Sequence, residues 1–145
     1  MPFRPLRLLI LFDDTRGYCG RVVPRMKEML EQRAFLVDVH RIQDGPVDIT
    51  PYAGLVIGTP VFGLGIKGVG PTPALTKFIE DLEDLDEKKV ALFCVYELRP
   101  GTTFDRMKGL ILEMGADFVA AHGYWLLRPR HQEHIIPAEC MVRIR

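Results

Sequence analysis

The stretch LRLLILF, residues 6–12, is an almost unbroken apolar run that ends at Asp13 and Asp14. Such a run is typical of a parallel strand that is buried on both faces of a sheet. Similar apolar runs return at 53–58 (AGLVIG) and at 90–96 (VALFCVY). These three runs predict inner strands of one parallel sheet, in which crossover connections join successive strands.

Amphipathic segments between the apolar runs predict the crossover helices. Apolar residues recur at helical spacing over 22–30 and again over 104–114, and Gly115 is expected to cap the second of these helices. Another helix is expected to start after Thr72, with Pro73 in its first turn, where a proline costs no helical hydrogen bond.

The outer strands and the connections between them are less regular. Strands are predicted at 34–39 and at 117–121, the latter continuing irregularly to Leu127. The segment 40–52 contains one glycine and two prolines and does not favour a regular helix. The order of elements predicts a single α/β domain over 1–145, a doubly wound five-stranded parallel sheet with a shortened second crossover and a short C-terminal element.

Composition excludes several classes of function. The 145 residues carry 19 basic and 19 acidic side chains, so the chain has no global attraction to nucleic acid or to an anionic membrane. The sequence contains no serine, which excludes a serine hydrolase. Cys19, Cys94 and Cys140 form no C-x-x-C pair, so free thiols are expected, and no metal site. With no apolar run long enough to span a membrane near the start, we expect a cytoplasmic protein.

The loops that follow the inner strands are the candidate site. In doubly wound sheets, ligands bind beyond the carboxyl ends of the strands, where the strand order reverses. The loops at this edge are 13–20, 59–70 and 97–102. The start of a helix after the first loop would present free backbone N–H groups and a positive dipole end to a phosphate.

Three segments that include these loops resemble the ligand-facing segments of the flavodoxin-like FMN-binding proteins. They are 8–23 (LLILFDDTRGYCGRVV), 48–63 (DITPYAGLVIGTPVFG) and 88–107 (KKVALFCVYELRPGTTFDRM), in the same order as in that family. The resemblance implies the strand order 2-1-3-4-5, FMN as the cofactor and a redox function. It assigns the phosphate to Thr15, Arg16, Gly17, Tyr18 and Cys19, and the isoalloxazine ring to Thr59, Pro60, Val61, Phe62, Tyr96, Glu97 and Gly101.

The phosphate loop departs from the family pattern. Family members carry a pattern similar to Ser-x-Thr-Gly-Asn-Thr, whereas 14–19 reads DTRGYC, with Thr15 as its one hydroxyl. Asp13 and Asp14 are expected to repel a phosphate dianion, and Arg16 offsets one of these charges. Pro24 belongs in the first turn of a helix, so we expect the helix to start near Gly20 or Arg21 and the phosphate site to be displaced.

The sequence leaves the kind of redox protein open. An electron carrier and an FMN-dependent oxidoreductase both fit, because the flavin carries the electrons and no side chain need act as acid or base. The zero net charge argues against a dedicated electron shuttle. The alternative is a flavodoxin-like domain without flavin, whose loops serve as a protein-interaction or regulatory module.

Two other chemistries are disfavoured. A response-regulator receiver needs a phosphoacceptor aspartate at the end of the third strand, where this chain has Gly58 and Thr59. Cys19 and Arg25 have the C-x5-R spacing of thiolate phosphatases, but the residues between them include Pro24, which has no N–H to donate.

Three remaining features concern the C-terminal part and possible partners. His131 and His134 are expected to lie in a solvated tail and not in a metal site. The acidic run 80–87 would suit a basic redox protein, and is otherwise a solvated helix end. The shortened crossover and C-terminal element leave apolar sheet area uncovered, so a homodimer is expected, with contacts from Leu126 onward or from the loop 59–70.

Overall fold

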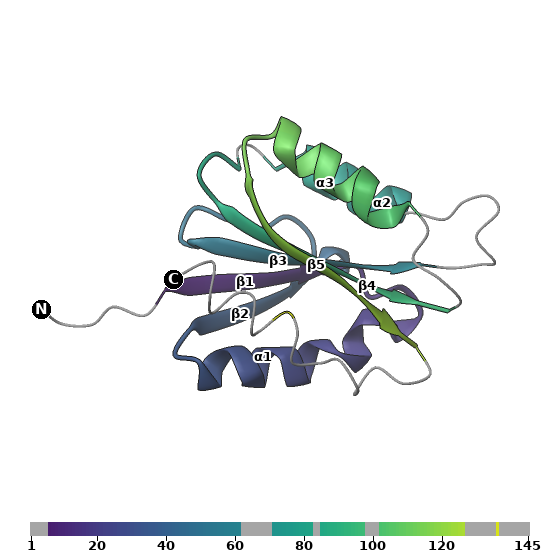
Figure 1. Ribbon diagram of the computed structural model, residues 1–145, viewed down its shortest axis with the longest axis horizontal. Helices are drawn as coiled ribbons and strands as arrows, with labels where there is room; N and C mark the ends of the chain where they lie inside the picture. The colour runs from purple at the N-terminus through teal and green to yellow at the C-terminus, as the bar shows by residue number, and fades with distance from the viewer. Residues whose placement is uncertain (1–5, 62–70, 83–84, 98–101, 127–135, 137–145) are drawn as a thin grey trace, which may run out of the picture.

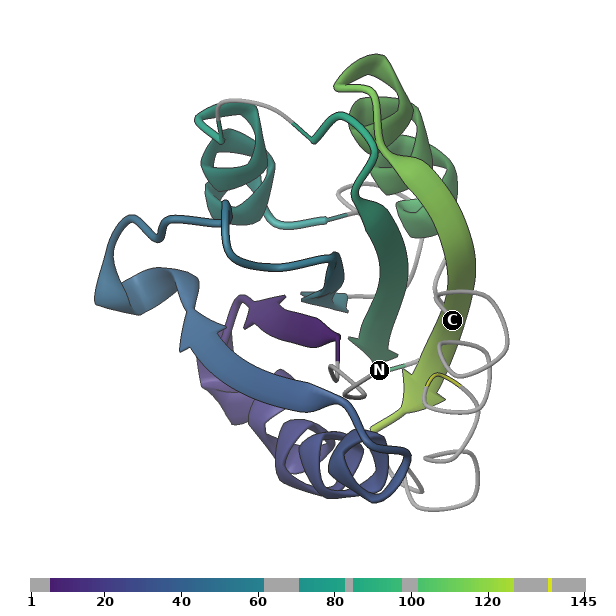
Figure 2. The same ribbon diagram turned by 90° about the vertical axis from the view of Figure 1, so that its left-hand side faces the viewer.

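The protein is a five-stranded parallel sheet with helices on both faces (Figures 1 and 2), seen in a computed structural model. The structure describes residues 6–61, 71–82, 85–97, 102–126 and 136. The strand order β2-β1-β3-β4-β5 confirms the predicted fold and its predicted order. The strands are β1 (Arg7–Phe12), β2 (Leu36–Arg41), β3 (Gly54–Val61), β4 (Lys89–Tyr96) and β5 (Asp117–Trp125). The helices are α1 (Val23–Gln32), α2 (Pro73–Glu80) and α3 (Thr103–Glu113), with 3-10 turns η1 (Thr15–Gly17), η2 (Cys19–Arg21) and η3 (Ile42–Asp44).

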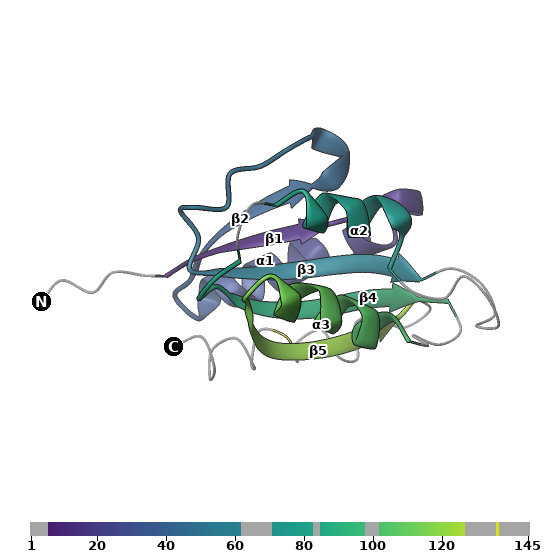
Figure 3. The ribbon, with the colours of Figure 1, turned by 90° about the horizontal axis from the view of Figure 1, so that it is seen from above.

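Helix α1 packs on one face of the sheet, and α2 and α3 pack on the other (Figure 3). Successive side chains of β1 point to opposite faces of the sheet. Leu8 and Ile10 pack in the core cluster that contains α1, and Leu9 and Leu11 pack in the cluster that contains α2 and α3. All four side chains are buried, and each contributes roughly 1.5–3 kcal/mol through removal from water. Ile136, from the C-terminal part, is also buried in the α1 cluster.

The bounds of the helices and strands follow local sequence signals, except that the predicted starts of α1 and β2 are wrong. Thr72 caps α2, accepting a hydrogen bond from the Leu75 N–H at 3.2 Å. Helix α1 begins at Val23, so the expected start near Gly20 or Arg21 is wrong, because those residues form the 3-10 turn η2. Strand β2 begins two residues later than predicted. Ala34 has a φ of 65°, a left-handed conformation that ends the turn after α1 and cannot extend a strand.

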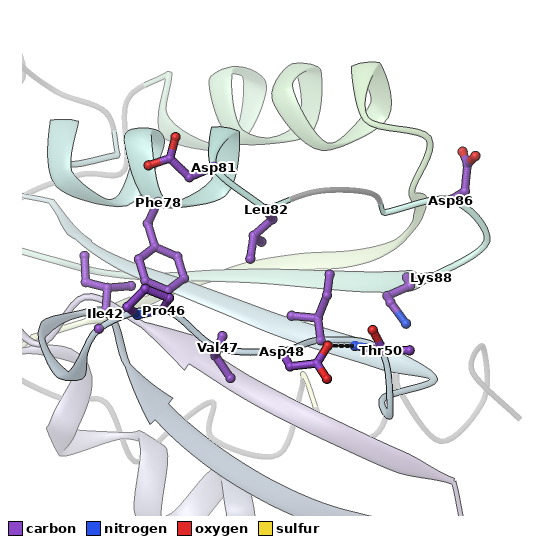
Figure 4. Close-up of a pocket in the computed structure, with 12 residues that line it drawn as sticks. Ile42, Pro46, Val47, Asp48, Thr50, Phe78, Asp81, Leu82, Asp86 and Lys88 are labelled. Atoms are coloured by element: carbon purple, nitrogen blue, oxygen red, sulfur yellow. Dashed lines mark hydrogen bonds between the residues drawn. The ribbon is translucent and has the colours of Figure 1, made fainter.

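The connection from β2 to β3 contains η3 but no α-helix, as the glycine and prolines predicted. A groove of about 760 Å³ lies between this connection and α2 (Figure 4). Ile42, Val47 and Phe78 give it apolar walls. The groove occupies space beside α2 that a crossover helix would otherwise fill.

Candidate functional site

The ends of β1, β3 and β4 lie side by side at the carboxyl edge of the sheet. The Asp13 N–H donates to the Gly58 carbonyl at 3.1 Å, joining the end of β1 to β3. The Glu97 N–H donates to the Val61 carbonyl at 3.4 Å, joining the end of β4 to the end of β3. Backbone hydrogen bonds therefore hold the ends of these three strands together at the edge where the sequence predicts the site.

Asp13 is a fully buried carboxylate that organises this edge. Its Oδ1 accepts from the Thr15 N–H at 3.0 Å, the Thr15 hydroxyl at 2.6 Å and the Gln43 side-chain amide at 2.6 Å. Its Oδ2 accepts from the Thr72 hydroxyl. Burial raises the pKa of Asp13, but the hydrogen bonds from Thr15, Thr72 and Gln43 outweigh burial and lower it. Asp13 therefore stays ionised and ties the first loop to η3 and to the start of α2.

Asp14 closes the first loop on itself. Its Oδ1 accepts a hydrogen bond from the Gly20 N–H at 3.1 Å, and its Oδ2 lies 3.5 Å from Nη1 of Arg41. The Asp14 N–H donates to Oε1 of Gln43 at 3.1 Å. A Cβ added at Gly20 would lie 2.8 Å from Oδ1 of Asp14, so only glycine allows this contact without a shift of the carboxylate. The carboxylate thus uses an N–H group just before α1.

The residues between Asp14 and Cys19 form a strained turn. Arg16 has a φ of 59° and Gly17 a φ of 69°, two successive left-handed residues of which only the glycine adopts this conformation without cost. The Gly17 N–H donates to the Asp14 carbonyl at 2.8 Å. Thr15, Arg16 and Gly17, which the sequence assigns to the phosphate, are exposed.

Glu97 joins the first loop to β4 and β5. Its carboxylate accepts a hydrogen bond from the Tyr18 hydroxyl and lies 3.6 Å from Nη1 of Arg16. The hydrogen bond to Glu97, followed by burial, raises the pKa of Tyr18. The indole N–H of Trp125 donates to the Glu97 carbonyl at 3.1 Å. Because β3 lies between β1 and β4, the Tyr18 to Glu97 contact spans the end of β3.

The predicted ring residues of β3 are buried. Thr59, Pro60 and Val61 form the last three residues of the strand, and none is exposed. The Thr59 hydroxyl donates to the Pro60 carbonyl at 3.1 Å and accepts from the Thr72 N–H at 3.2 Å. This hydroxyl therefore holds the start of α2 against β3.

Tyr96 at the end of β4 is half-buried. A Cβ added at Gly123 of β5 would lie 3.0 Å from Cε1 of Tyr96, so the ring packs closely over that glycine. Two further predicted ring residues, Phe62 and Gly101, lie outside the residues that the structure describes.

The cysteines in the described part of the chain are buried thiols. Cys19 and Cys94 are both fully buried and free of disulfides. Burial, reinforced by the neighbouring negative charge of Asp13, raises the pKa of Cys19 well above its usual range, and burial raises the pKa of Cys94 to about 12. A thiolate nucleophile at Cys19 is therefore disfavoured. Cys19 as a whole is buried in the core cluster that contains α1.

Three residues that hold the site were absent from the predicted set. Gln43 and Thr72 donate to Asp13 from distant points of the sequence, and no local pattern marks this role. Trp125 had a usable signal, because it is the only tryptophan and follows directly on the apolar part of the fifth strand.

The described ranges contain neither a cluster of metal ligands nor a helix that could span a membrane. No group of three or more His, Cys, Asp or Glu side chains there could hold a metal ion. The predicted tail residues His131 and His134 lie outside those ranges. Of the helices in the described parts of the chain, none has the length and apolar character needed to cross a bilayer.

Comparison with known proteins gives one family and a consistent set of folds. The sequence profile of the flavodoxin domain family matches residues 9–117. Flavodoxin 1 from Bacillus cereus, in its oxidised form, has a TM-score of 0.76 at 21% identity, covering 94% of this chain and 97% of that one. The two-electron reduced flavodoxin of Megasphaera elsdenii has a TM-score of 0.79 at 20% identity, covering 94% and 98%. A Fusobacterium nucleatum flavodoxin bound to flavin mononucleotide has a TM-score of 0.63 at 15% identity, covering 79% and 69%. Comparison with curated protein sequences gives no match.

Proposed function

Because the chain belongs to the flavodoxin domain family, we propose that it is an FMN-binding redox protein whose flavin lies beyond the ends of β1, β3 and β4. Family membership supports an FMN-binding redox function, and the related Fusobacterium nucleatum flavodoxin is bound to flavin mononucleotide. When bound, the flavin supplies the electron-transfer chemistry, and the protein supplies binding, orientation and electrostatics. The observation that carries the proposal is the meeting of the strand ends at the carboxyl edge, where Glu97 contacts Tyr18, Val61 and Trp125.

The part of the edge formed by Tyr18, Tyr96, Glu97 and Trp125, which we call the ring-facing half, fits a flavin. A flat, mostly apolar ring system favours aromatic neighbours and a few fixed polar groups. Tyr18 and Tyr96 are half-buried there, and Trp125 is 39% exposed. Glu97 fixes Tyr18 and Trp125 relative to one another through hydrogen bonds. These side chains would position the ring without having to reorganise.

The part of the edge formed by Thr15, Arg16 and Gly20, which we call the phosphate-facing half, does not fit a phosphate group. The N–H groups of Thr15 and Gly20 donate to the carboxylates of Asp13 and Asp14, and so are not directed at an incoming anion. Arg16 is exposed and shares its charge with Glu97. We therefore derive no role for the phosphate in binding, and the proposal rests on the ring-facing half and on the family.

The test is the visible spectrum of the purified protein, followed by titration with FMN while flavin fluorescence is measured. We expect quenching and a shifted absorbance band at a one-to-one ratio, because a stacked flavin loses its solvent environment. A colourless protein that leaves added FMN unchanged would overturn the proposal. The alternative is a flavin-free interaction module, which is favoured by the internal satisfaction of the phosphate loop.

A flavin-loaded protein would then be tested as carrier or oxidoreductase. We propose no catalytic acid or base, so turnover would depend on whether a nicotinamide reduces the bound flavin directly. Stopped-flow absorbance with NADH and NADPH distinguishes the two. Rapid bleaching indicates an FMN-dependent oxidoreductase, and no bleaching indicates a carrier that receives electrons from a protein partner.

Assembly and location also remain proposals. We propose a homodimer in the cytoplasm, with a redox protein as a further partner and no role for nucleic acid or membrane. The buried free thiols of Cys19 and Cys94 support a reducing compartment. Leu36 on the edge strand β2 is 52% exposed, which supports association through uncovered apolar area. Most of the predicted contact, 62–70 and the segment after Leu126 apart from Ile136, lies outside the described residues. Light scattering that gives a monomer mass at micromolar concentration would exclude the dimer.

A further inference from the structure

We propose that the site prefers a flavin without a phosphate, so that riboflavin binds at least as tightly as FMN, because the Asp14 carboxylate already holds the Gly20 N–H of η2 and the Arg41 guanidinium. This inference rests on the proposed flavin function. It follows from the hydrogen bonds that the donors of the first loop already make to acceptors within the protein.

The carboxylate of Asp14 has the partners that a phosphate would need. One oxygen accepts from the Gly20 N–H at 3.1 Å, and the other lies 3.5 Å from Nη1 of Arg41. A backbone amide before a helix and a guanidinium are the typical donors of a phosphate site. A flavin phosphate could use these groups only after Asp14 had left them.

Asp13 prevents the loop from relaxing to make room. Its four hydrogen bonds join it to Thr15, Gln43 and Thr72, which belong to η1, η3 and the cap of α2. Gln43 also accepts from the Asp14 N–H at 3.1 Å, so one side chain holds both the Asp13 carboxylate and the Asp14 backbone. Moving the loop would therefore break contacts in three separate elements.

The local charge disfavours a phosphate dianion as well. Arg41 is shared between Asp14 and Asp44, whose Oδ1 lies 3.0 Å from Nη2 of Arg41. Arg16 is paired with Glu97 at 3.6 Å. Both guanidinium groups thus face carboxylates already, and the buried Asp13 has neutral donors alone.

The same groups suit the neutral side chain of riboflavin. Ribityl hydroxyl groups are hydrogen-bond donors, and carboxylates are the strongest acceptors in proteins. Asp14 and Glu97 can accept such hydrogen bonds without leaving their present partners, because each carboxylate has about four lone-pair sites. The arrangement therefore selects an uncharged, hydroxylated flavin.

The test compares riboflavin and FMN binding to the full-length apoprotein by fluorescence quenching at pH 7. We expect the Kd of FMN to equal or exceed that of riboflavin. Raising the salt concentration should tighten FMN binding and leave riboflavin unchanged, because salt screens repulsion between like charges. This part of the test needs no variant, so it stands even if a substitution impairs folding.

The variant Asp14→Asn keeps an oxygen for the Gly20 N–H but removes the charge. We expect it to tighten FMN binding about tenfold and to change riboflavin binding by less than about twofold. Asp44→Asn is the matched control, because it removes another carboxylate from the same guanidinium without touching the loop amides. We expect Asp44→Asn to change the ratio of the two Kd values by less than about threefold.

The outcomes separate this inference from the function on which it rests. FMN binding tighter than riboflavin binding in the parent protein would overturn the inference and leave the flavin function intact. Failure of both flavins to bind would overturn the proposed function, and this inference with it.

Discussion

The hydroxyl of Tyr18 donates a hydrogen bond to the carboxylate of Glu97, 79 positions further along the chain. The two residues follow β1 and β4, which are not neighbours in the sheet. The contact therefore fixes the distance between the first loop and the end of β4 at the carboxyl edge. Loss of this hydrogen bond should lower the free energy of unfolding and weaken ligand binding.

Tyr18→Phe removes this hydrogen bond and keeps the ring. A hydrogen bond to a charged group contributes roughly 1.5–3 kcal/mol, and partial exposure of both residues favours the lower end, so we expect a loss of about 1.5 kcal/mol. Urea unfolding followed by circular dichroism measures it. Arg16→Gln, which removes the exposed guanidinium that pairs with Glu97, is the control and should cost less than about 0.5 kcal/mol. Equal losses in the two variants would contradict a special role for Tyr18.

Asp13→Asn should be much more harmful. An amide in place of the carboxylate presents an N–H₂ group to donors that need an acceptor, leaving at least one buried donor unsatisfied. We expect the free energy of unfolding to fall by about 3 kcal/mol. Asp48→Asn, at an exposed carboxylate that accepts from the Thr50 N–H at 3.0 Å, should cost less than about 1 kcal/mol. A comparable effect of the two substitutions would show that burial of Asp13 has no energetic consequence.

Acid should destabilise the protein through the same carboxylate. The pKa of Asp13 in the folded state lies below the ordinary value of 3.8. The unfolded chain then binds the proton more readily, so the stabilisation is fully present above about pH 4 and is lost as the pH falls through the folded-state pKa. Urea midpoints at pH 7, 5, 4 and 3 should fall at the acid end. The decline should be shallower in Asp13→Asn, and parallel curves would rule out this contribution.

Gly58→Ala tests the packing that places the end of β3. A Cβ at Gly58 would lie 2.0 Å from Cζ of Phe93 on the neighbouring strand, a contact that requires the buried ring to move. Overpacking of this kind costs about 1–3 kcal/mol, and the short distance favours the upper end. Gly109→Ala is the control, because nothing lies within 4 Å of its Cβ and Gly109 sits inside α3. There alanine should stabilise by about 0.5–1 kcal/mol. Thermal melting distinguishes these opposite signs.

Arg16→Ala tests whether the positive charge of the first loop affects flavin binding. The Arg16 side chain is exposed and offsets negative charge at the edge, so its loss should weaken FMN binding more than riboflavin binding, by about threefold. Paired fluorescence titrations measure the ratio. Equal weakening of both flavins would remove Arg16 from the neighbourhood of the phosphate.

The sequence predicted the parts of the fold that depend on local patterns. The five strands, the three helices and the missing crossover helix follow from apolar periodicity and from the positions of Gly and Pro. The start of β2 was missed because Ala34 takes a left-handed φ that its residue type does not signal. The shift in the start of α1 comes from the 3-10 turn η2, which replaces a regular first turn.

The site was harder to predict than the fold because its partners are distant in sequence. Both aspartates were recognised as unfavourable to phosphate, yet their actual contacts depend on Gln43, 30 positions from Asp13, and on Thr72, 59 positions away. Thr72 was predicted as a helix cap, which it is, but its hydroxyl also donates to Asp13. Such pairings arise from tertiary packing and leave no mark in a short stretch of sequence.

The helix-free connection from η3 to β3 makes the fold open to engineering. Pro46, Asp48 and Thr50 are exposed, and the connection rejoins the sheet where the Ala53 N–H donates to the Arg7 carbonyl, at the edge opposite the site. Lengthening a loop costs only about 0.6 kcal/mol for each doubling. A reporter domain or an epitope inserted next to the exposed Pro46, ahead of the buried Ile49, would therefore leave the sheet and the carboxyl edge undisturbed.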